Sequence, residues 1–328
     1  MIRFYLSVLL LFVVSCSNVV ASRVKAHKKS NTEVIKCPTM EEFQPIADSI
    51  LAEGVRLYGY EKAAWMTSDS VRTHCKNLDD IGVSVVYEEG NVFTCIFSDE
   101  KEENVVFCGK GKLDALKREL QWSNEVRPLS GVEKEALNAK KKCIQKLSES
   151  YGDSIFNMPS ANGSLNIDII KRNEGYRLYI LQGTALMGII PYGNDYIVDY
   201  DNNFNITSFK RCHKGFLALP VESGKKVESS MHSHTPDNPY MSVTDVCTSL
   251  LYGRDLYGIQ TFVVLSTYFT NGFMIQFSTE DMKINGFDVD FLKKSTVNKQ
   301  KNYNVNSLLS RIYEESEEEI EKPYLVNV

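Results

Sequence analysis

The sequence has no excess of positive charge. Its 328 residues include 37 lysines and arginines against 42 aspartates and glutamates, which gives a formal net charge of −5 at pH 7. Short basic clusters occur at residues 23–29 and 140–142, and both are typical of a linker or a solvated helix face. Proteins that bind nucleic acid carry a strongly basic surface. The charge balance therefore predicts no nucleic-acid partner.

A regular cysteine framework is also lacking. The eight cysteines follow no regular spacing and include no Cys-x-x-Cys pair. Disulfides are therefore possible but cannot be assigned from the sequence. Cys95 and Cys108 lie in apolar, strand-like segments, and Cys247 lies within a predicted helix. We expect all three in the protein core, where free cysteine behaves as a small apolar side chain.

The N-terminus lacks an apolar run long enough to cross a membrane comfortably. The run at residues 4–14 has the length of a signal-peptide core; Arg3 precedes it and small residues follow. This pattern predicts a targeting segment at residues 1–21. The protein is therefore expected to leave the cytoplasm.

Two fates of this segment are open. The sequence Val13-Val14-Ser15-Cys16 resembles the lipobox of bacterial lipoproteins, and that resemblance implies a lipid on Cys16 that anchors the protein to a membrane. Cleavage after Ala21 would instead release a secreted protein. In both cases the polar, basic residues 22–36 would form a tether to the folded body.

The composition suits a folded protein, and the pattern of its apolar residues predicts the α+β class. Hydrophobic residues make up 43% of the chain, enough for a sizeable core and, at this length, for two domains. We expect a small α+β domain at residues 37–125. Apolar residues recur every three or four positions at 40–60, which predicts a helix. Alternating apolar segments between turns predict antiparallel strands at 83–87, 92–97 and 104–108.

A second domain is predicted at residues 130–290. It opens with a helix at 130–150, and strands are expected at 165–170, 176–181, 196–200, 216–219 and 260–267. The segment 296–328 reads as a polar linker followed by an acidic C-terminal helix, which is most often solvated.

The most informative pattern is His232-x-His234, seven residues, then Ser242-x-x-Asp245. Residues two apart on a strand share a face, so both imidazoles can point at one spot. Asp245 lies in the first turn of a predicted helix that begins at Ser242 and stops at Gly253. Two histidines, one carboxylate and a fourth position for water form the ligand set of a catalytic zinc. The alternative is a helix-capping box, in which Ser242 and Asp245 only cap the helix.

This motif resembles that of the JAMM (MPN-plus, JAB-type) zinc metalloproteases, although Thr235 stands where that family commonly has proline. The resemblance implies that His232, His234 and Asp245 bind Zn²⁺ and that Ser242 stabilises the tetrahedral intermediate. It also implies a JAMM-like α/β/α domain with a mixed sheet, covering roughly residues 130–280. The predicted order of helices and strands agrees with that expectation.

The resemblance requires a glutamate upstream as general base. Glu174 lies at a suitable distance, directly before a predicted strand, whereas Glu222 and Glu228 lie in a polar connection. We therefore favour Glu174. His213 is the remaining histidine close enough in sequence to support the site or bind substrate, although a structural role is the more common one for such a residue.

The sequence thus predicts a zinc-dependent amide or peptide hydrolase, with isopeptides included, that acts on a peptide or protein substrate of the cell envelope. His232-Ser-His234-Thr also resembles the opening motif of PHP-type phosphoesterases. That family needs further metal-binding histidines downstream, and none follows His234. The alternative from another class is a catalytically inactive JAMM-like lipoprotein that serves as an envelope binding module.

Overall fold

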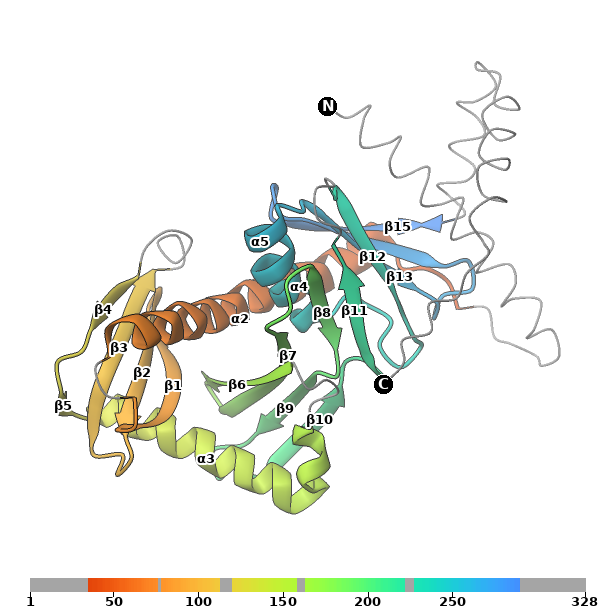
Figure 1. Cartoon of the computed structure of the whole chain (residues 1–328). Helices are drawn as coiled ribbons and strands as arrows, with labels where there is room; N and C mark the ends of the chain where they lie inside the picture. Colours follow the sequence, from red (N-terminus) through yellow and green to blue (C-terminus); the bar gives the residue numbers. More distant parts are fainter. Residues whose placement is uncertain (1–34, 76–77, 113–119, 158–162, 222–226, 290–328) are drawn as a thin grey trace, which may run out of the picture. The chain divides into compact units, whose positions relative to one another are not determined.

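The computed structural model describes residues 35–75, 78–112, 120–157, 163–221 and 227–289 (Figure 1). The predicted targeting segment with Cys16, nearly all of the tether and the acidic C-terminal segment lie outside these residues. No helix within the described ranges combines the length and the apolar character needed to cross a membrane. The chain divides into two compact units: Met1–Cys37, Phe269–Met274 and Phe287–Val328 form the first, and Pro38–Tyr268 with Ile275–Gly286 form the second.

Helix α2 (Met40–His74) opens the second unit. It begins at a capping box in which the Thr39 side chain accepts from the Glu42 N–H and the Glu42 carboxylate accepts from the Thr39 N–H. The expected helix ended at residue 60, so the prediction was too short. Ala63, Thr67 and Val71 are buried at four-residue spacing and continue the buried stripe for three more turns.

The predicted meander is present and forms the first sheet. Strands β1 (Ile81–Glu89), β2 (Val92–Asp99) and β3 (Asn104–Lys112) pair antiparallel in that order. Two short strands that were not predicted, β4 (Gln121–Ser123) and β5 (Arg127–Pro128), both pair with β3. Helix α2 packs against β2 and β3.

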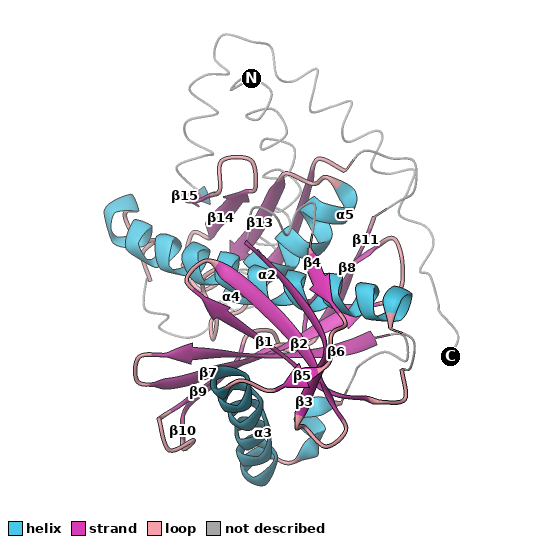
Figure 2. Cartoon of the chain, turned by 90° about the vertical axis from the view of Figure 1, so that its left-hand side faces the viewer, coloured by secondary structure: helices cyan, strands magenta, loops and turns pink. Residues whose placement is uncertain are grey.

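Helix α3 (Gly131–Tyr151), followed by the 3-10 turn η2 (Asp153–Phe156), covers one face of the second sheet. This sheet has the order β10-β9-β7-β6, with β6 at Gly163–Arg172, β7 at Gly175–Thr184, β9 at Tyr196–Tyr200 and β10 at Ile206–Arg211. Alternate residues of these strands form one core cluster with α3. Figures 1 and 2 both show α3 beside β9 and β10.

The remaining elements include the strand and the helix that carry the metal-ligand motif. Strand β8 (Ile189–Gly193) pairs with β11 (Phe216–Pro220), and the last sheet has the order β12-β13-β14-β15. Its strands are β12 (Ser229–His234), β13 (Thr261–Ser266), β14 (Phe273–Ser278) and β15 (Lys283–Asp288). Strands β12 and β13 are parallel. The predicted α+β class with a mixed sheet is confirmed.

The motif helix is α4 (Val243–Thr248), which continues through the π-helical segment η3 (Ser249–Arg254) into α5 (Asp255–Tyr257). The predicted stop at Gly253 was therefore too early, and the chain instead leaves the helix at Gly258, which has φ +68°. Helix α2 lies directly against α4: a Cβ at Gly54 would come within 2.5 Å of the Val246 Cβ. The glycine permits this close approach, so α2 supports the helix that carries Asp245.

Candidate metal centre

Four side chains converge on one point in the second unit. His232 and His234 come from β12, Asp245 from the first turn of α4, and His213 from the loop between β10 and β11. One ligand atom from each lies within 4.8 Å of every other. The three residues expected from the motif are thus brought together, and His213 joins them. The group could bind a metal ion.

Local structure explains why the two motif histidines meet. His232 and His234 pair with Val264 and Ser266 of the parallel strand β13, so both project from the same face of β12. The intervening Ser233 is exposed. The strand supplies two imidazoles at a fixed spacing, and its pairing with β13 prevents a shift of register.

Asp245 serves two roles at once. The Ser242 side chain accepts from the Asp245 N–H at 2.9 Å, and Asp245 Oδ2 accepts from the Ser242 N–H at 2.7 Å. The capping box is therefore present, and it is compatible with metal binding because Oδ1 stays available. That atom lies 3.1 Å from Nε2 of His213 and 3.2 Å from Nε2 of His232.

Hydrogen bonds at Nδ1 fix the orientation of two of the imidazoles. His234 donates from Nδ1 to the Tyr240 carbonyl oxygen at 2.7 Å, and His213 Nδ1 lies 2.7 Å from Asp195 Oδ1. Carbonyl and carboxylate oxygens only accept, so we assign both protons to Nδ1. Each Nε2 then carries a lone pair, and the two atoms face each other at 3.0 Å. Only a proton or a metal cation between them removes that repulsion.

The spacing of the donors fits a small cation. Zinc bonds to nitrogen and oxygen of about 2.0–2.1 Å in a tetrahedron put neighbouring ligand atoms about 3.3–3.4 Å apart. His234 Nε2 lies 3.1 Å from His232 Nε2 and 3.3 Å from Asp245 Oδ2. In addition, Asp245 Oδ1 is buried and accepts no hydrogen bond from the described residues. Such an orphaned atom is expected where a cation completes the set.

The charge of the cluster points to a divalent ion. When all three imidazoles are neutral, as metal ligands are, the cluster carries two negative charges, from Asp245 and Asp195, both on side chains at most 4% exposed. Burial raises the pKa of Asp245, but the three histidines hold it well below its usual value. Burial lowers the pKa of His213, yet Asp245 and Asp195 raise it to about 11. The cluster therefore attracts positive charge, and a divalent cation neutralises it.

Asp195 connects two of the ligand-bearing elements. One carboxylate oxygen accepts from His213 and the other from the Thr244 hydroxyl of α4. Sequence reasoning missed Asp195, which follows β8 in what reads as an ordinary Asn-Asp turn, and it assigned His213 at most a supporting role. No local spacing signals either residue, because the contacts span 18 and 49 positions of the chain.

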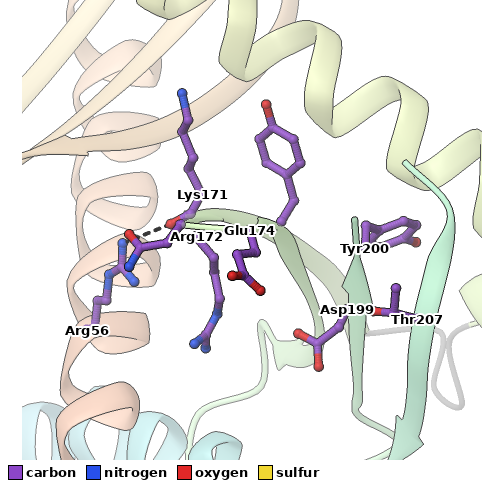
Figure 3. Close-up of a pocket in the computed structure, with 9 residues that line it drawn as sticks. Arg56, Lys171, Arg172, Glu174, Asp199, Tyr200 and Thr207 are labelled. Atoms are coloured by element: carbon purple, nitrogen blue, oxygen red, sulfur yellow. Dashed lines mark hydrogen bonds between the residues drawn. The ribbon is translucent and has the colours of Figure 1, made fainter. Parts of the chain in front are cut away.

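The two predicted catalytic residues lie in different places. Ser242 is at the centre, but its hydroxyl is buried and engaged with the Asp245 N–H and with Thr244 Oγ1 at 2.7 Å. Glu174 lies in the turn between β6 and β7, outside the cluster (Figure 3). That turn lies against Tyr200, at the end of β9. Asp195 directly precedes the other end of this strand, five residues away, which corresponds to about 17 Å at the rise of a β-strand.

The structure thus does not bring Glu174 to the metal ligands. Glu222 lies outside the described residues, and no described glutamate belongs to the cluster. Comparison with known proteins gave no match: no family model fits the chain, and no curated protein or solved structure is similar to it. The resemblance to the JAMM metalloproteases therefore depends on the motif alone and stays a prediction.

Proposed function

We propose that this protein is a zinc-binding module of the cell envelope, in which one ion is held in a closed site by four protein ligands. The observation that carries the proposal is the position of His213. Its Nε2 lies 3.0 Å from His234 Nε2 and 3.1 Å from Asp245 Oδ1, close enough for His213 to act as a fourth ligand. A site with four protein ligands is typical of structural zinc, whereas catalytic zinc keeps a position for water.

Zinc is favoured by the kind of donors. Three imidazole nitrogens with one carboxylate oxygen suit zinc, which accepts tetrahedral sets of nitrogen and oxygen, better than calcium or magnesium, which prefer oxygen alone. The outer partners also fit. Metal-bound histidine commonly donates its second N–H to a carboxylate or carbonyl, as His213 does to Asp195 and His234 to the Tyr240 carbonyl.

The ion would connect three segments that are distant in the sequence. The loop after β10, strand β12 and helix α4 each supply a ligand, so binding would fix their relative positions and add to folding stability. The surface around the ion would then be available to a peptide or protein partner. The envelope location depends on residues 1–21 and on lipidation at Cys16.

A second candidate is the zinc-dependent peptide hydrolase. It is favoured by one observation: His232, His234 and Asp245 converge without help from His213, so they alone form a three-ligand set. A zinc ion there would lower the pKa of its water to about 7 and polarise a carbonyl. This function requires His213 to leave the vertex and a general base to reach the site, whether Glu174 or another acid.

Metal analysis of the purified full chain tests the proposal and separates the two candidates. We expect about one zinc per chain in the wild type and none in the variant with His232→Ala and His234→Ala. His213→Ala is the deciding variant. A binding module loses zinc affinity and shows no cleavage of a peptide library. Cleavage by His213→Ala or by the wild type, abolished by His232→Ala, would instead establish the hydrolase.

A further inference from the structure

A pocket of about 600 Å³ lies at the end of the second sheet, on the side of α2 (Figure 3). It is lined by Arg56 of α2, Arg172 of β6, Glu174 of the β6–β7 turn, Asp199 of β9 and Thr207 of β10. The volume falls in the range of small-molecule sites, roughly 300–1,000 Å³. The residue that the sequence suggested as a general base thus belongs to a separate cavity.

The strand register explains how the lining side chains meet. Ile170 pairs with Arg177, and Arg177 pairs with Asp199. Because alternate residues share a face, Arg172 and Asp199 lie on the same side of the sheet as Arg177. Figure 3 shows Arg172, Glu174 and Asp199 on one side of the ribbon, whereas Lys171 extends to the other.

The turn that carries Glu174 is held in place. Gly175 has φ +131°, and a Cβ there would come within 1.9 Å of the Tyr200 carbonyl oxygen. Only glycine permits this close approach. The β6–β7 turn that carries Glu174 is therefore held against the end of β9, at Tyr200 and Asp201.

One carboxylate of the pocket has no cationic partner among the described residues. Glu174 makes no hydrogen bond or ion pair with any residue that the structure describes. The other charged residues pair among themselves: Arg56 with Glu88, Lys171 with Glu135, Arg172 with Glu53, and Arg177 with Glu53 and Asp199. Four cationic side chains thus accompany five carboxylates, so the pocket and its ion-pair partners carry one excess negative charge.

Two arginines of the pocket keep unused hydrogen-bond donors. Arg172 uses Nη2 for Glu53, which leaves Nη1 for another acceptor. Arg56 uses Nε and Nη2 for Glu88 and the Lys171 carbonyl, which leaves Nη1 for another acceptor. A guanidinium donor of this kind recognises a carboxylate. The pocket therefore offers guanidinium donors close to carboxylate acceptors.

We propose that this pocket binds a small basic amino acid of the lysine type. The ligand carboxylate would accept from Arg172 and Arg56, and an ammonium group would donate to Glu174 and to the free lone pairs of Asp199. A basic amino acid carries one net positive charge, which offsets the excess negative charge of the pocket. This inference is independent of the metal centre and of the function proposed for it.

Calorimetric titration of the full chain with three probes tests the proposal. L-lysine carries a carboxylate and two ammonium groups, 1,5-diaminopentane keeps only ammonium groups, and glutarate keeps only carboxylates. We expect lysine to bind with a Kd on the order of 1 mM, as suits ten non-hydrogen atoms in an open pocket. Diaminopentane should bind several-fold more weakly, and glutarate should not bind.

Glu174→Gln provides the specific test. It should weaken lysine binding about tenfold or more, because a charged partner is lost, and it should leave the unfolding midpoint unchanged. Glu125→Gln, which removes the same charge from an exposed loop between β4 and β5, is the matched control and should bind as the wild type. Equal binding of lysine and glutarate, or unchanged lysine binding by Glu174→Gln, would overturn the proposal.

Discussion

Two buried clusters of the second unit each contain two carboxylates, and they neutralise them differently. At the metal centre, Asp245 lies against three imidazoles and Asp195 against one. In the other cluster, Glu61 of α2 lies against Asp168 of β6, and the amide of Asn166 donates to Glu61 at 2.6 Å. Glu61 Oε1 and Asp168 Oδ2 find no hydrogen-bond donor among the described residues. Each cluster therefore contains a buried carboxylate oxygen that accepts no hydrogen bond from the described residues.

The difference lies in the lone pairs that accompany the acids. Histidines fixed at Nδ1 present the Nε2 lone pair to a metal ion. The only neutral side chain bonded to the Glu61–Asp168 pair among the described residues is the amide of Asn166, which donates a proton and adds no lone pair for a metal ion. Burial and then Asp168 raise the pKa of Glu61 well above its usual value, and burial raises that of Asp168. A shared proton thus serves the carboxyl pair, where a divalent ion serves the histidine cluster. A buried acid indicates a metal site only when oriented donors surround it.

The largest effect should follow from removal of the ion. A chelator should lower the free energy of unfolding by about 4 kcal/mol if the ion is present at a thousand times its Kd. Scanning calorimetry with and without chelator measures the shift. The variant with His232→Ala and His234→Ala is the control and should not respond to chelator. An equal response of both proteins would show that the chelator acts elsewhere.

Asp195→Asn tests how far the outer carboxylate strengthens the metal centre. The substitution keeps the shape but removes one of the two negative charges and weakens the hold on His213. We expect zinc affinity to fall about 10- to 100-fold, measured by competition with a chromophoric chelator. Thr244→Val breaks the contact on the other side of Asp195 without a change of charge, and it should have the smaller effect.

Asp168→Asn tests the proton-sharing pair. A raised pKa of Glu61 in the folded state means that folding binds a proton. This contribution to stability is complete below the unfolded pKa of about 4.5 and is lost as pH rises toward the folded pKa. Each unit of raised pKa corresponds to about 1.4 kcal/mol. Asp168→Asn removes the repelling charge, so the free energy of unfolding should fall less steeply between pH 5 and 8.

Urea unfolding of zinc-loaded wild type and of zinc-loaded Asp168→Asn, measured across this pH range, gives the comparison. Both proteins keep the same metal centre, so the difference reports the carboxyl pair alone. Parallel pH profiles of the two proteins would contradict a shared proton.

The sequence predicted the parts of the metal centre that local spacing encodes. The alternation of β12 places His232 and His234 on one face, and the capping box places Asp245 in the first turn of α4. His213 and Asp195 reach the site only through the pairing of β8 with β11 and the order of the second sheet. These long-range contacts leave no periodic signal, so the number of ligands, and with it the vacancy that catalysis requires, could not be read from the motif.

The helices show the same difference between local signals, which the sequence reveals, and long-range contacts, which it does not. The helix starts predicted near residue 130 and at Ser242 were correct, and both helices begin at a capping box. The ends of α2 and of the α4 helical segment were misjudged, because tertiary packing extends both beyond their apparent stops. Glu61 illustrates the cause: a buried acid interrupts the apolar pattern of α2, and its partner Asp168 lies on a strand more than a hundred residues away.

The smallest predicted effect separates the two meanings of the Ser-x-x-Asp motif. If Ser242 only caps α4, then Ser242→Ala should cost about 1 kcal/mol of unfolding free energy, as should Ser130→Ala at the equivalent capping box of α3. Chemical unfolding of both variants with zinc bound gives the comparison. A markedly larger loss for Ser242→Ala, together with weaker zinc binding, would show that the hydroxyl supports Asp245 as a ligand. Equal losses with unchanged zinc affinity would leave it a helix cap beside a metal site.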